Sequence, residues 1–167
     1  MATTYEAIAT VTVGSGGAAS IDFTSIPATY TDLCLKVSLR TGSVGAEAVI
    51  IEFNGATTGF TAKRLYGQGV SVSTDTLTNI RFAIDTAADT ASTFANGEFY
   101  VPNYAGANYK SVSTDGVNET NASIAIASLV AGLWSNTAAI TSIKLTGNGA
   151  GSFVQYSSAT LYGIKNS

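Results

Sequence analysis

Apolar and polar residues alternate along several short segments of the chain. The clearest is segment 32–40, where leucine or valine occupies every second position from Leu33 to Leu39. A period of two is typical of a β-strand with one buried face. Segments 49–53 and 79–84 show the same period. Further segments rich in β-branched and aromatic residues also favour strands, namely 5–13, 19–23, 97–101, 109–113, 123–133, 140–146 and 158–164.

Glycine- and asparagine-rich pieces separate these segments. Gly and Asn accept the positive φ angles that tight turns between antiparallel strands require. The Ala-rich stretch 85–95 is where we expect a short turn of helix. The predicted turns lie at 14–17, 54–55, 67–69, 96–97, 102–103, 115–116 and 147–151.

Many short strands with turns between them predict an all-β fold. We expect an antiparallel β-sandwich with a jelly-roll-like topology, formed by a single domain over residues 1–167. An immunoglobulin-like strand order stays open, because it produces the same alternation. The chain has no internal repeat of about 20 to 50 residues, which argues against a propeller or a solenoid.

The chain carries little charge. Charged residues make up 11% of it and hydrophobic residues 46%, whereas soluble domains contain roughly 25% charged residues. Uncharged polar residues and glycine must therefore cover much of the surface. This indicates either an exterior partly buried in an assembly or a domain with Thr- and Gly-rich turns. Because the net charge is -3, there is no basic field for phosphate groups, and we expect no nucleic-acid partner.

The sequence does not have the pattern of a membrane protein. Its longest apolar stretch, 122–134, is broken by Ser and Gly and is shorter than the ~20 residues that span a bilayer. The N-terminus lacks the basic region and apolar core of a signal peptide. We therefore expect no membrane association and no signal peptide.

Histidine is absent, and Cys34 is the single cysteine. The sequence therefore has no Ser-His or Cys-His nucleophile pair and no internal disulfide. Two carboxylates would suffice for glycoside hydrolysis, and Glu52 and Glu98 lie on predicted strands. Both are explained more simply as outward residues of those strands. We expect no enzyme activity and no cofactor.

Calcium is the ion that suits the remaining oxygen ligands, because loop Asp and Asn side chains can coordinate it. The candidate groups do not match an EF-hand loop, and the second of them favours an ordinary hairpin turn. We therefore expect no metal site. The two groups are Asp85 with Asp89, and Asp115 with Asn118 and Glu119.

Aromatic side chains are the remaining candidates for contact with a partner. Tyr104 and Tyr109 lie in a polar loop, where exposure is expected. Tyr100 stands just before that loop. Trp134 ends an apolar strand, a position that favours the core over a site. These four residues could stack on a sugar or pack on a neighbouring subunit.

Four segments resemble small β-sandwich structural proteins and tail-fibre modules of tailed bacteriophages. They are 21–33, 100–105, 132–143 and 158–164, so the resemblance extends over most of the chain. None of them is a catalytic signature. The resemblance implies a protein of the virion, because related modules serve as head decoration or cement proteins, tail components and receptor-binding heads.

No heptad stalk or β-helical repeat precedes the predicted sandwich, which favours a capsid decoration protein. We expect it to be a homotrimer that binds the major capsid protein or another virion protein and stabilises the head. A neutral, Thr-rich exterior suits such contacts because little charge is desolvated on docking. The alternative is a tail or tail-fibre adhesion module that binds a host surface glycan through aromatic side chains.

Overall fold

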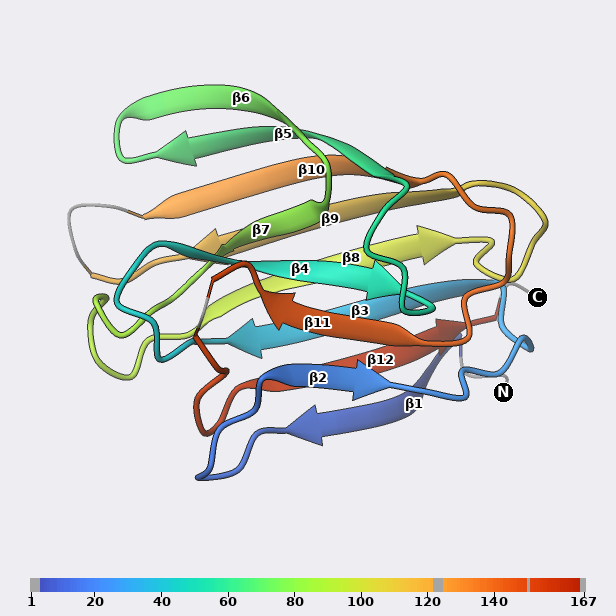
Figure 1. Ribbon diagram of the computed structural model, residues 1–167, viewed down its shortest axis with the longest axis horizontal. Helices are drawn as coiled ribbons and strands as arrows, with labels where there is room; N and C mark the ends of the chain where they lie inside the picture. The colour runs from blue at the N-terminus through green and yellow to red at the C-terminus, as the bar shows by residue number, and fades with distance from the viewer. Residues whose placement is uncertain (1–3, 122–124, 150, 166–167) are drawn as a thin grey trace.

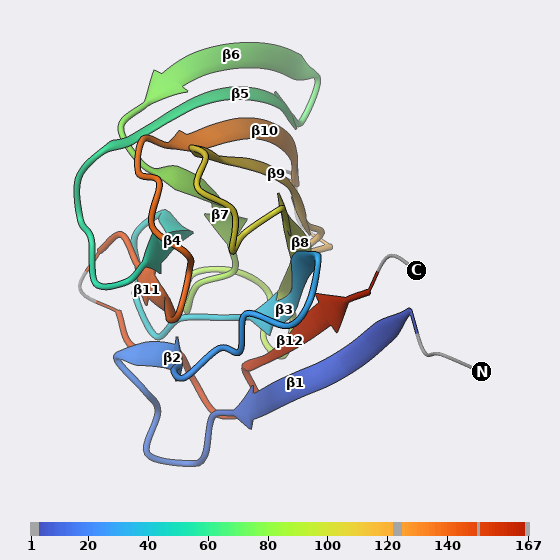
Figure 2. The same cartoon turned by 90° about the vertical axis from the view of Figure 1, so that its right-hand side faces the viewer.

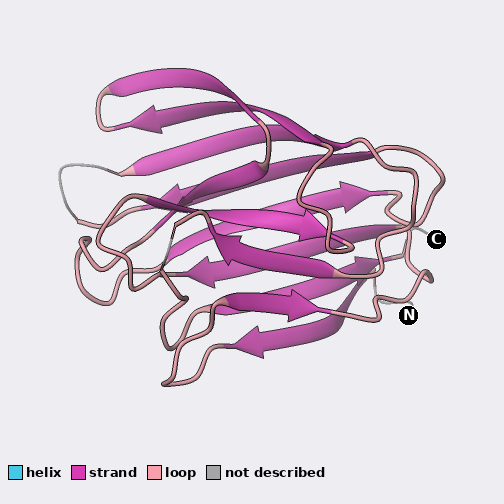
Figure 3. Cartoon of the chain, in the orientation of Figure 1, coloured by secondary structure: helices cyan, strands magenta, loops and turns pink. Residues whose placement is uncertain are grey.

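The computed structural model describes residues 4–121, 125–149 and 151–165, which form β-strands joined by loops, with no helix among them (Figure 3). The expected all-β fold is therefore confirmed. The strands are β1 (Tyr5–Thr12), β2 (Ser20–Phe23), β3 (Asp32–Leu39), β4 (Glu47–Phe53), β5 (Phe60–Gln68), β6 (Ser71–Leu77), β7 (Ile80–Ile84), β8 (Ala95–Pro102), β9 (Lys110–Asn118), β10 (Ile126–Trp134), β11 (Ile143–Gly147) and β12 (Ser158–Ile164).

The strands form two antiparallel sheets that pack face to face (Figure 1 and Figure 2). The larger sheet has the order β1-β12-β3-β8-β9-β10-β5-β6, and the smaller has the order β2-β11-β4-β7. The connections β2–β3, β3–β4 and β4–β5 each cross from one sheet to the other. The β5–β6 hairpin stays in the larger sheet, and β7 and β11 belong again to the smaller sheet. This connectivity is that of a jelly roll, so the expected sandwich is confirmed.

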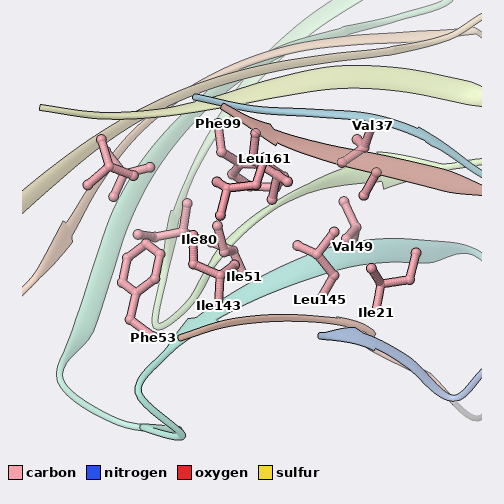
Figure 4. Close-up of a cluster of buried hydrophobic side chains, with 14 of the residues drawn as sticks. Ile21, Val37, Val49, Ile51, Phe53, Ile80, Phe99, Ile143, Leu145 and Leu161 are labelled. Carbon is pink, nitrogen blue, oxygen red and sulfur yellow. The ribbon is translucent and has the colours of Figure 1, made fainter. Parts of the chain in front are cut away.

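The core lies between the two sheets (Figure 4). The smaller sheet contributes Ile51, Phe53 and Leu145, and the larger sheet contributes Phe99 and Leu161. All five side chains are fully buried. Each such side chain adds about 2 kcal/mol of hydrophobic stabilisation relative to an exposed position. Inward apolar residues at alternate positions therefore hold the sheets together, as the sequence pattern predicts.

Strand β7 packs closely against the larger sheet because glycines lie beneath it. A Cβ atom at Gly97 of β8 would lie 2.5 Å from the Phe82 ring, and one at Gly132 of β10 would lie 2.6 Å from Ile80. No real Cβ atom approaches a neighbour so closely. The glycines thus admit the bulky side chains of β7, which fixes the position of β7 over β8 and β10.

The sequence-based predictions fail at several places. The pairs 96–97 and 115–116 were predicted as turns but lie inside β8 and β9. The expected helical turn at 85–95 is also wrong, because an irregular loop joins β7 to β8 there. Strands β5 and β6 were not predicted at all. Some predicted positions lie outside the described residues: 123 and 124 of the predicted strand 123–133, 150 of the predicted turn 147–151, and 1–3, 122 and 166–167 of the expected domain.

Candidate functional site

The larger sheet has one face against the core and one face turned away from the smaller sheet, which we call the outer face. Burial alternates strictly along β9, where the odd-numbered residues Ser111, Ser113, Asp115 and Val117 are exposed. Successive side chains of a strand point to opposite faces. The cross-strand register then determines which side chains of the neighbouring strands share the outer face.

A groove of about 1100 Å³ lies on the outer face over five adjacent strands, β8, β9, β10, β5 and β6. These strands form the upper part of the larger sheet in Figure 2. Two parallel rows of side chains cross the groove. One row runs Tyr100, Ser113, Ala131, Lys63 and Thr76, and the other runs Glu98, Asp115, Leu129, Leu65 and Thr74.

One end of the groove is apolar. We define the aliphatic patch as Leu65, Val72, Val117, Ala127 and Leu129, which come from four adjacent strands. Val72 is 75% exposed, Leu129 62%, Leu65 46% and Val117 39%. Leu129 lies directly opposite Leu65, and Ala127 directly opposite Val117, beneath a second hollow of about 410 Å³. Large patches of exposed apolar side chains are typical of surfaces that contact another molecule.

The other part of the groove is polar, and its charges are partly paired. Glu98 lies opposite Asp115 in the sheet register, but Lys36 approaches Glu98 to 3.0 Å. The hydrogen bond with Glu98 raises the pKa of the Lys36 ammonium group. Lys63 donates a hydrogen bond to Thr76 Oγ1 across the β5–β6 hairpin. This half of the groove offers hydroxyl, carboxylate and ammonium groups to a ligand.

Tyr100 lines the groove with its half-buried ring. Its hydroxyl donates a hydrogen bond of 2.8 Å to Asp32 Oδ2, and Asp32 Oδ1 accepts the backbone N–H of Asn103 at 2.9 Å. The hydrogen bond to Asp32 raises the pKa of Tyr100 to about 12. The hydroxyl is therefore held as a neutral donor to Asp32, while the ring remains accessible from the groove.

Cys34 belongs to the outer face by register but is fully buried. It lies between Tyr162 of β12 and Tyr100 of β8 in the same cross-strand row. Burial, and secondarily the nearby Glu98 carboxylate, raises the pKa of the Cys34 thiol to about 12. The thiolate is the nucleophilic form, so a thiol with this pKa is unreactive at neutral pH.

Tyr104 is not exposed, contrary to the sequence-based expectation. It is fully buried, and its hydroxyl donates a hydrogen bond to the backbone carbonyl of Pro27. The loop folds back so that this ring completes the core. Tyr109, from the same loop, is 56% exposed but does not line the groove. Of these two candidate contacts, Tyr109 alone has an accessible ring.

Trp134 is also a core residue, as its position at the end of an apolar strand favoured. It is 2% exposed. Its ring lies 5.6 Å from that of Phe53 and stacks on that of Phe60 at 6.0 Å, centroid to centroid. Trp134 therefore stabilises the packing of β10, β4 and β5, and its side chain cannot serve as a partner contact.

The Asp115 group does not form an ion site. Asp115 lies on the outer face of β9, whereas Asn118 is buried on the inner face. The Asn118 side-chain oxygen accepts the backbone N–H of Ile126 at 2.8 Å. Two side chains that point to opposite faces of one strand cannot coordinate the same ion. The expectation of a hairpin turn here is wrong, since the segment is the regular end of a strand.

Asp89 is likewise engaged in the fold, whereas the carboxylate oxygens of Asp85 have no hydrogen-bond partner among the described residues. Asp85 is fully buried, and this burial raises its pKa. Asp89 Oδ2 accepts the backbone N–H of Thr86 at 2.8 Å, so Asp89 fixes the start of the loop. Among the described residues, no group of three or more Cys, Asp and Glu side chains is arranged to hold a metal ion.

Sequence reasoning missed the aliphatic patch because two of its members lie on strands that were not predicted, Leu65 on β5 and Val72 on β6. In β5 the inward side includes Arg64 and the outward side includes Leu65, so apolar residues do not mark one face. The available signal was the turn predicted at 67–69, which overlaps by one residue the turn at 69–70 that joins these two strands as a hairpin.

Comparisons with protein-family models, with curated proteins and with solved structures found no significant match to this chain. Within the described residues there is no helix that could span a membrane. The candidate site is therefore characterised by its own geometry: a groove with a polar half around Tyr100 and an exposed aliphatic half around Leu129.

Proposed function

We propose that this chain is a structural protein of a bacteriophage particle, of the capsid decoration type, which attaches to other virion proteins through its outer face. The resemblance of four segments to phage β-sandwich proteins supports the location. The aliphatic patch is the main observation that supports attachment through the outer face. The partners in this proposal are the major capsid protein or another virion protein, together with further copies of the chain.

Docking the aliphatic patch would remove exposed leucine and valine side chains from water. Burial of apolar surface contributes roughly 25 cal/mol per Å². The neighbouring outward residues Ser113 and Ala131 are small and uncharged, so their desolvation costs little. Arg64 and Asp75, which border the groove, already form an ion pair at 2.7 Å. The surface is therefore suited to protein contact over a broad area.

The chemistry of the patch favours a protein partner over a glycan. Sugars are bound largely by aromatic rings that stack on them, and among the residues that line the groove Tyr100 is the single aromatic. The exposed side chains at the other end are aliphatic: Leu65, Val72, Val117 and Leu129. Aliphatic side chains pack well against a protein surface and offer no ring to a sugar.

The location is tested by cryo-electron microscopy of phage particles that contain the protein. We expect its density at regular positions on the head surface, with the outer face of the larger sheet against the shell. Density confined to the tail, or particles without the protein, would contradict the proposal. Density on the head with the smaller sheet against the shell would support the proposed location but would contradict docking through the outer face of the larger sheet.

The docking face is tested by sedimentation of the protein with heads that lack it. We expect Leu129→Lys to lower the amount bound at least about tenfold, because a buried ammonium group without a partner costs several kcal/mol. Val44→Lys is the control, because Val44 is 82% exposed on the loop between β3 and β4. Equal binding by the two variants would exclude the aliphatic patch as the docking surface.

A glycan-binding adhesion module of the tail is the second candidate. The polar half of the groove supports it, because the Tyr100 ring lies beside Ser113 and near the carboxylates of Glu98 and Asp115. A glycan array tests it with Tyr100→Ala and, as a control outside the groove, Tyr109→Ala. Binding that Tyr100→Ala abolishes and Tyr109→Ala preserves would favour this function over the structural one.

A further inference from the structure

The sandwich has four sheet edges, and they differ in how they are protected. The larger sheet ends at β1 and β6, and the smaller sheet ends at β2 and β7. β2 has four residues and β7 has five. Short strands offer few backbone groups to another chain, and proteins commonly blunt exposed edges in this way. Another chain could therefore add a strand to the larger sheet at its two longer edges, β1 and β6.

β1 carries two of the protections typical of exposed edges. Its register with β12 shifts between Ala7 and Ala9, which indicates a bulge. Its Glu6 side chain forms an ion pair of 3.1 Å with Lys165, which places charge beside the edge. Bulges and charged side chains disfavour the addition of another strand. β1 is thus a poor template for pairing.

β6 lacks these protections. Its seven residues pair with β5 in an unbroken register from Ser71 to Leu77, without proline. Its single charged residue, Asp75, forms a bidentate pair with Arg64 at 3.1 and 2.7 Å, and the hydrogen bonds from Arg64 lower the pKa of Asp75. Within the described residues, no strand pairs with the other edge of β6. Its backbone N–H and C=O groups on that side are available.

We infer that β6 pairs antiparallel with β6 of a second copy of this chain, so that two eight-stranded sheets become one continuous sheet. An antiparallel pair of identical strands is related by a two-fold axis, and each strand presents to its partner the same groups that it receives. A seven-residue pair forms about seven backbone hydrogen bonds, close to the number in an ordinary protein interface. This number of bonds is sufficient for a second copy to occupy the edge.

Two features of the strand favour this occupant over an unrelated partner. Self-pairing brings identical charges together, and in β6 the Asp75 charge is already compensated by Arg64, so the two copies do not repel. Val72 is 75% exposed and lies on the outer face next to the edge. The two-fold axis runs perpendicular to the sheet, so the outer faces of both copies point the same way and their aliphatic patches become neighbours.

The inference does not depend on the proposed function, and it predicts a symmetry different from the homotrimer expected from the sequence. The protein in solution should have twice the mass of one chain when measured by light scattering after size-exclusion chromatography. Amide hydrogen exchange of residues 71–77 should slow as the protein concentration rises, whereas exchange in β1 should not change. A monomer, a trimer, or concentration-dependent protection at β1 would each overturn the inference.

A pair of matched variants tests the role of the edge. Thr74→Lys places an ammonium group on β6 near its copy across the axis, and we expect the dimer Kd to rise about tenfold or more. Thr61→Lys places the same group on the same face of β5, away from the edge, and should leave the Kd unchanged. Circular dichroism should show both variants folded. An equal Kd for the two variants would overturn the inference.

If Thr74→Lys does not fold, Val72→Lys provides the same test from another exposed position of β6, with Val44→Lys as its control. A dimer that survives both substitutions in β6 with an unchanged Kd would place the contact elsewhere. An unchanged Kd would reject the β6 dimer but would say nothing about where the protein lies on the phage particle. That location is tested separately by the density on the virion, so the two proposals are rejected by different results.

Discussion

The phenyl ring of Phe82 on β7 lies directly on Gly116 of β9. A Cβ atom built on Gly116 would come within 2.1 Å of the Phe82 ring, which is less than the sum of the atomic radii. Gly97 of β8 pairs with Gly116 in the sheet register and lies under the same ring. This aromatic residue therefore occupies a recess with a glycine floor, and it locks the smaller sheet onto the larger one.

Gly116→Ala should destabilise the protein by about 3 kcal/mol, since overpacking a closed core forces side chains and backbone to move. The free energy of unfolding in urea measures the effect. Gly67→Ala on β5 is the control, because the nearest atom to its added Cβ, Ser71 O, lies 4.0 Å away. If Gly116→Ala lowered the free energy of unfolding no more than Gly67→Ala, the Phe82 ring would be able to move aside at little cost.

Arg40 organises the loop between β7 and β8. Its Nη1 donates hydrogen bonds to the backbone carbonyls of Thr90 and Thr93 at 2.8 and 2.9 Å, and its Nη2 donates one to Asp89 O at 3.1 Å. Lysine has the charge but not the planar fork that reaches several carbonyls at once. Arg40→Lys should therefore speed amide hydrogen exchange in residues 86–94.

The matched control for this loop is Arg81→Lys on β7, which makes the same chemical change outside the loop. Exchange in residues 86–94 should stay at the wild-type rate in that variant. Equal rates in Arg40→Lys and the wild type would mean that the loop is held by its own hydrogen bonds, such as the one that the Thr86 backbone N–H donates to Asp89.

Cys34 should not react with a thiol reagent in the folded protein. The side chain is fully buried, and burial raises its pKa from 9.0 to about 12, so little thiolate exists at neutral pH. Labelling with an aromatic disulfide followed by absorbance should show reaction only at the rate of global unfolding. Rapid labelling without denaturant would show that Tyr100 and Tyr162 do not cover the thiol.

The same pKa shift predicts a pH dependence of stability. The folded state holds the Cys34 proton more tightly than the unfolded state, so this contribution is complete below pH 9.0 and is lost as the pH rises toward about 12. Cys34→Ala should therefore lose less stability than the wild type between about pH 8 and 11. Identical pH profiles from urea unfolding would contradict the shift.

Lys110 joins two loops from a fully buried position. Its Nζ donates hydrogen bonds to the carbonyls of Gly106 and Asn108 at 2.5 Å each and approaches Thr137 O at 3.4 Å. Burial lowers the pKa of this ammonium group. Lys110→Met keeps the apolar stem but leaves these carbonyls unsatisfied, so it should destabilise the protein by about 2 kcal/mol.

Thermal and urea unfolding of Lys110→Met measure this loss. Lys144→Met on β11 is a control at a half-buried strand position, and its effect should stay within about 0.5 kcal/mol. A loss at Lys110 as small as at Lys144 would show that water replaces the ammonium group without cost.

The strands with one apolar face could be predicted from the sequence. Segments 32–40 and 158–164 match β3 and β12 closely, and in segment 32–40 the alternation of apolar and polar residues is a clear pattern. β5 and β6 could not, since both of their faces are partly exposed and polar residues occupy each. β5 and β6 contribute to the groove and the aliphatic patch, and β6 is the free edge. The candidate site could therefore not be predicted from the alternation of apolar and polar residues.

Two glycine pairs show how a local signal can mislead. Asn96-Gly97 and Asp115-Gly116 have the composition of tight turns, yet both lie within strands. Their glycines are needed for space beneath Phe82 rather than for a positive φ angle. That need arises from a residue distant in sequence, on the opposite sheet, and no local window contains it.

The sequence by itself determined the all-β class, a core of alternating apolar residues and a weakly charged exterior, because these follow from local periodicity and composition. Only the tertiary structure decided that Tyr104 is buried, that Leu65 and Leu129 share an exposed patch, and that β6 is an unprotected edge. These properties depend on strand order and register, which bring distant segments together, and the chain's local pattern does not encode them.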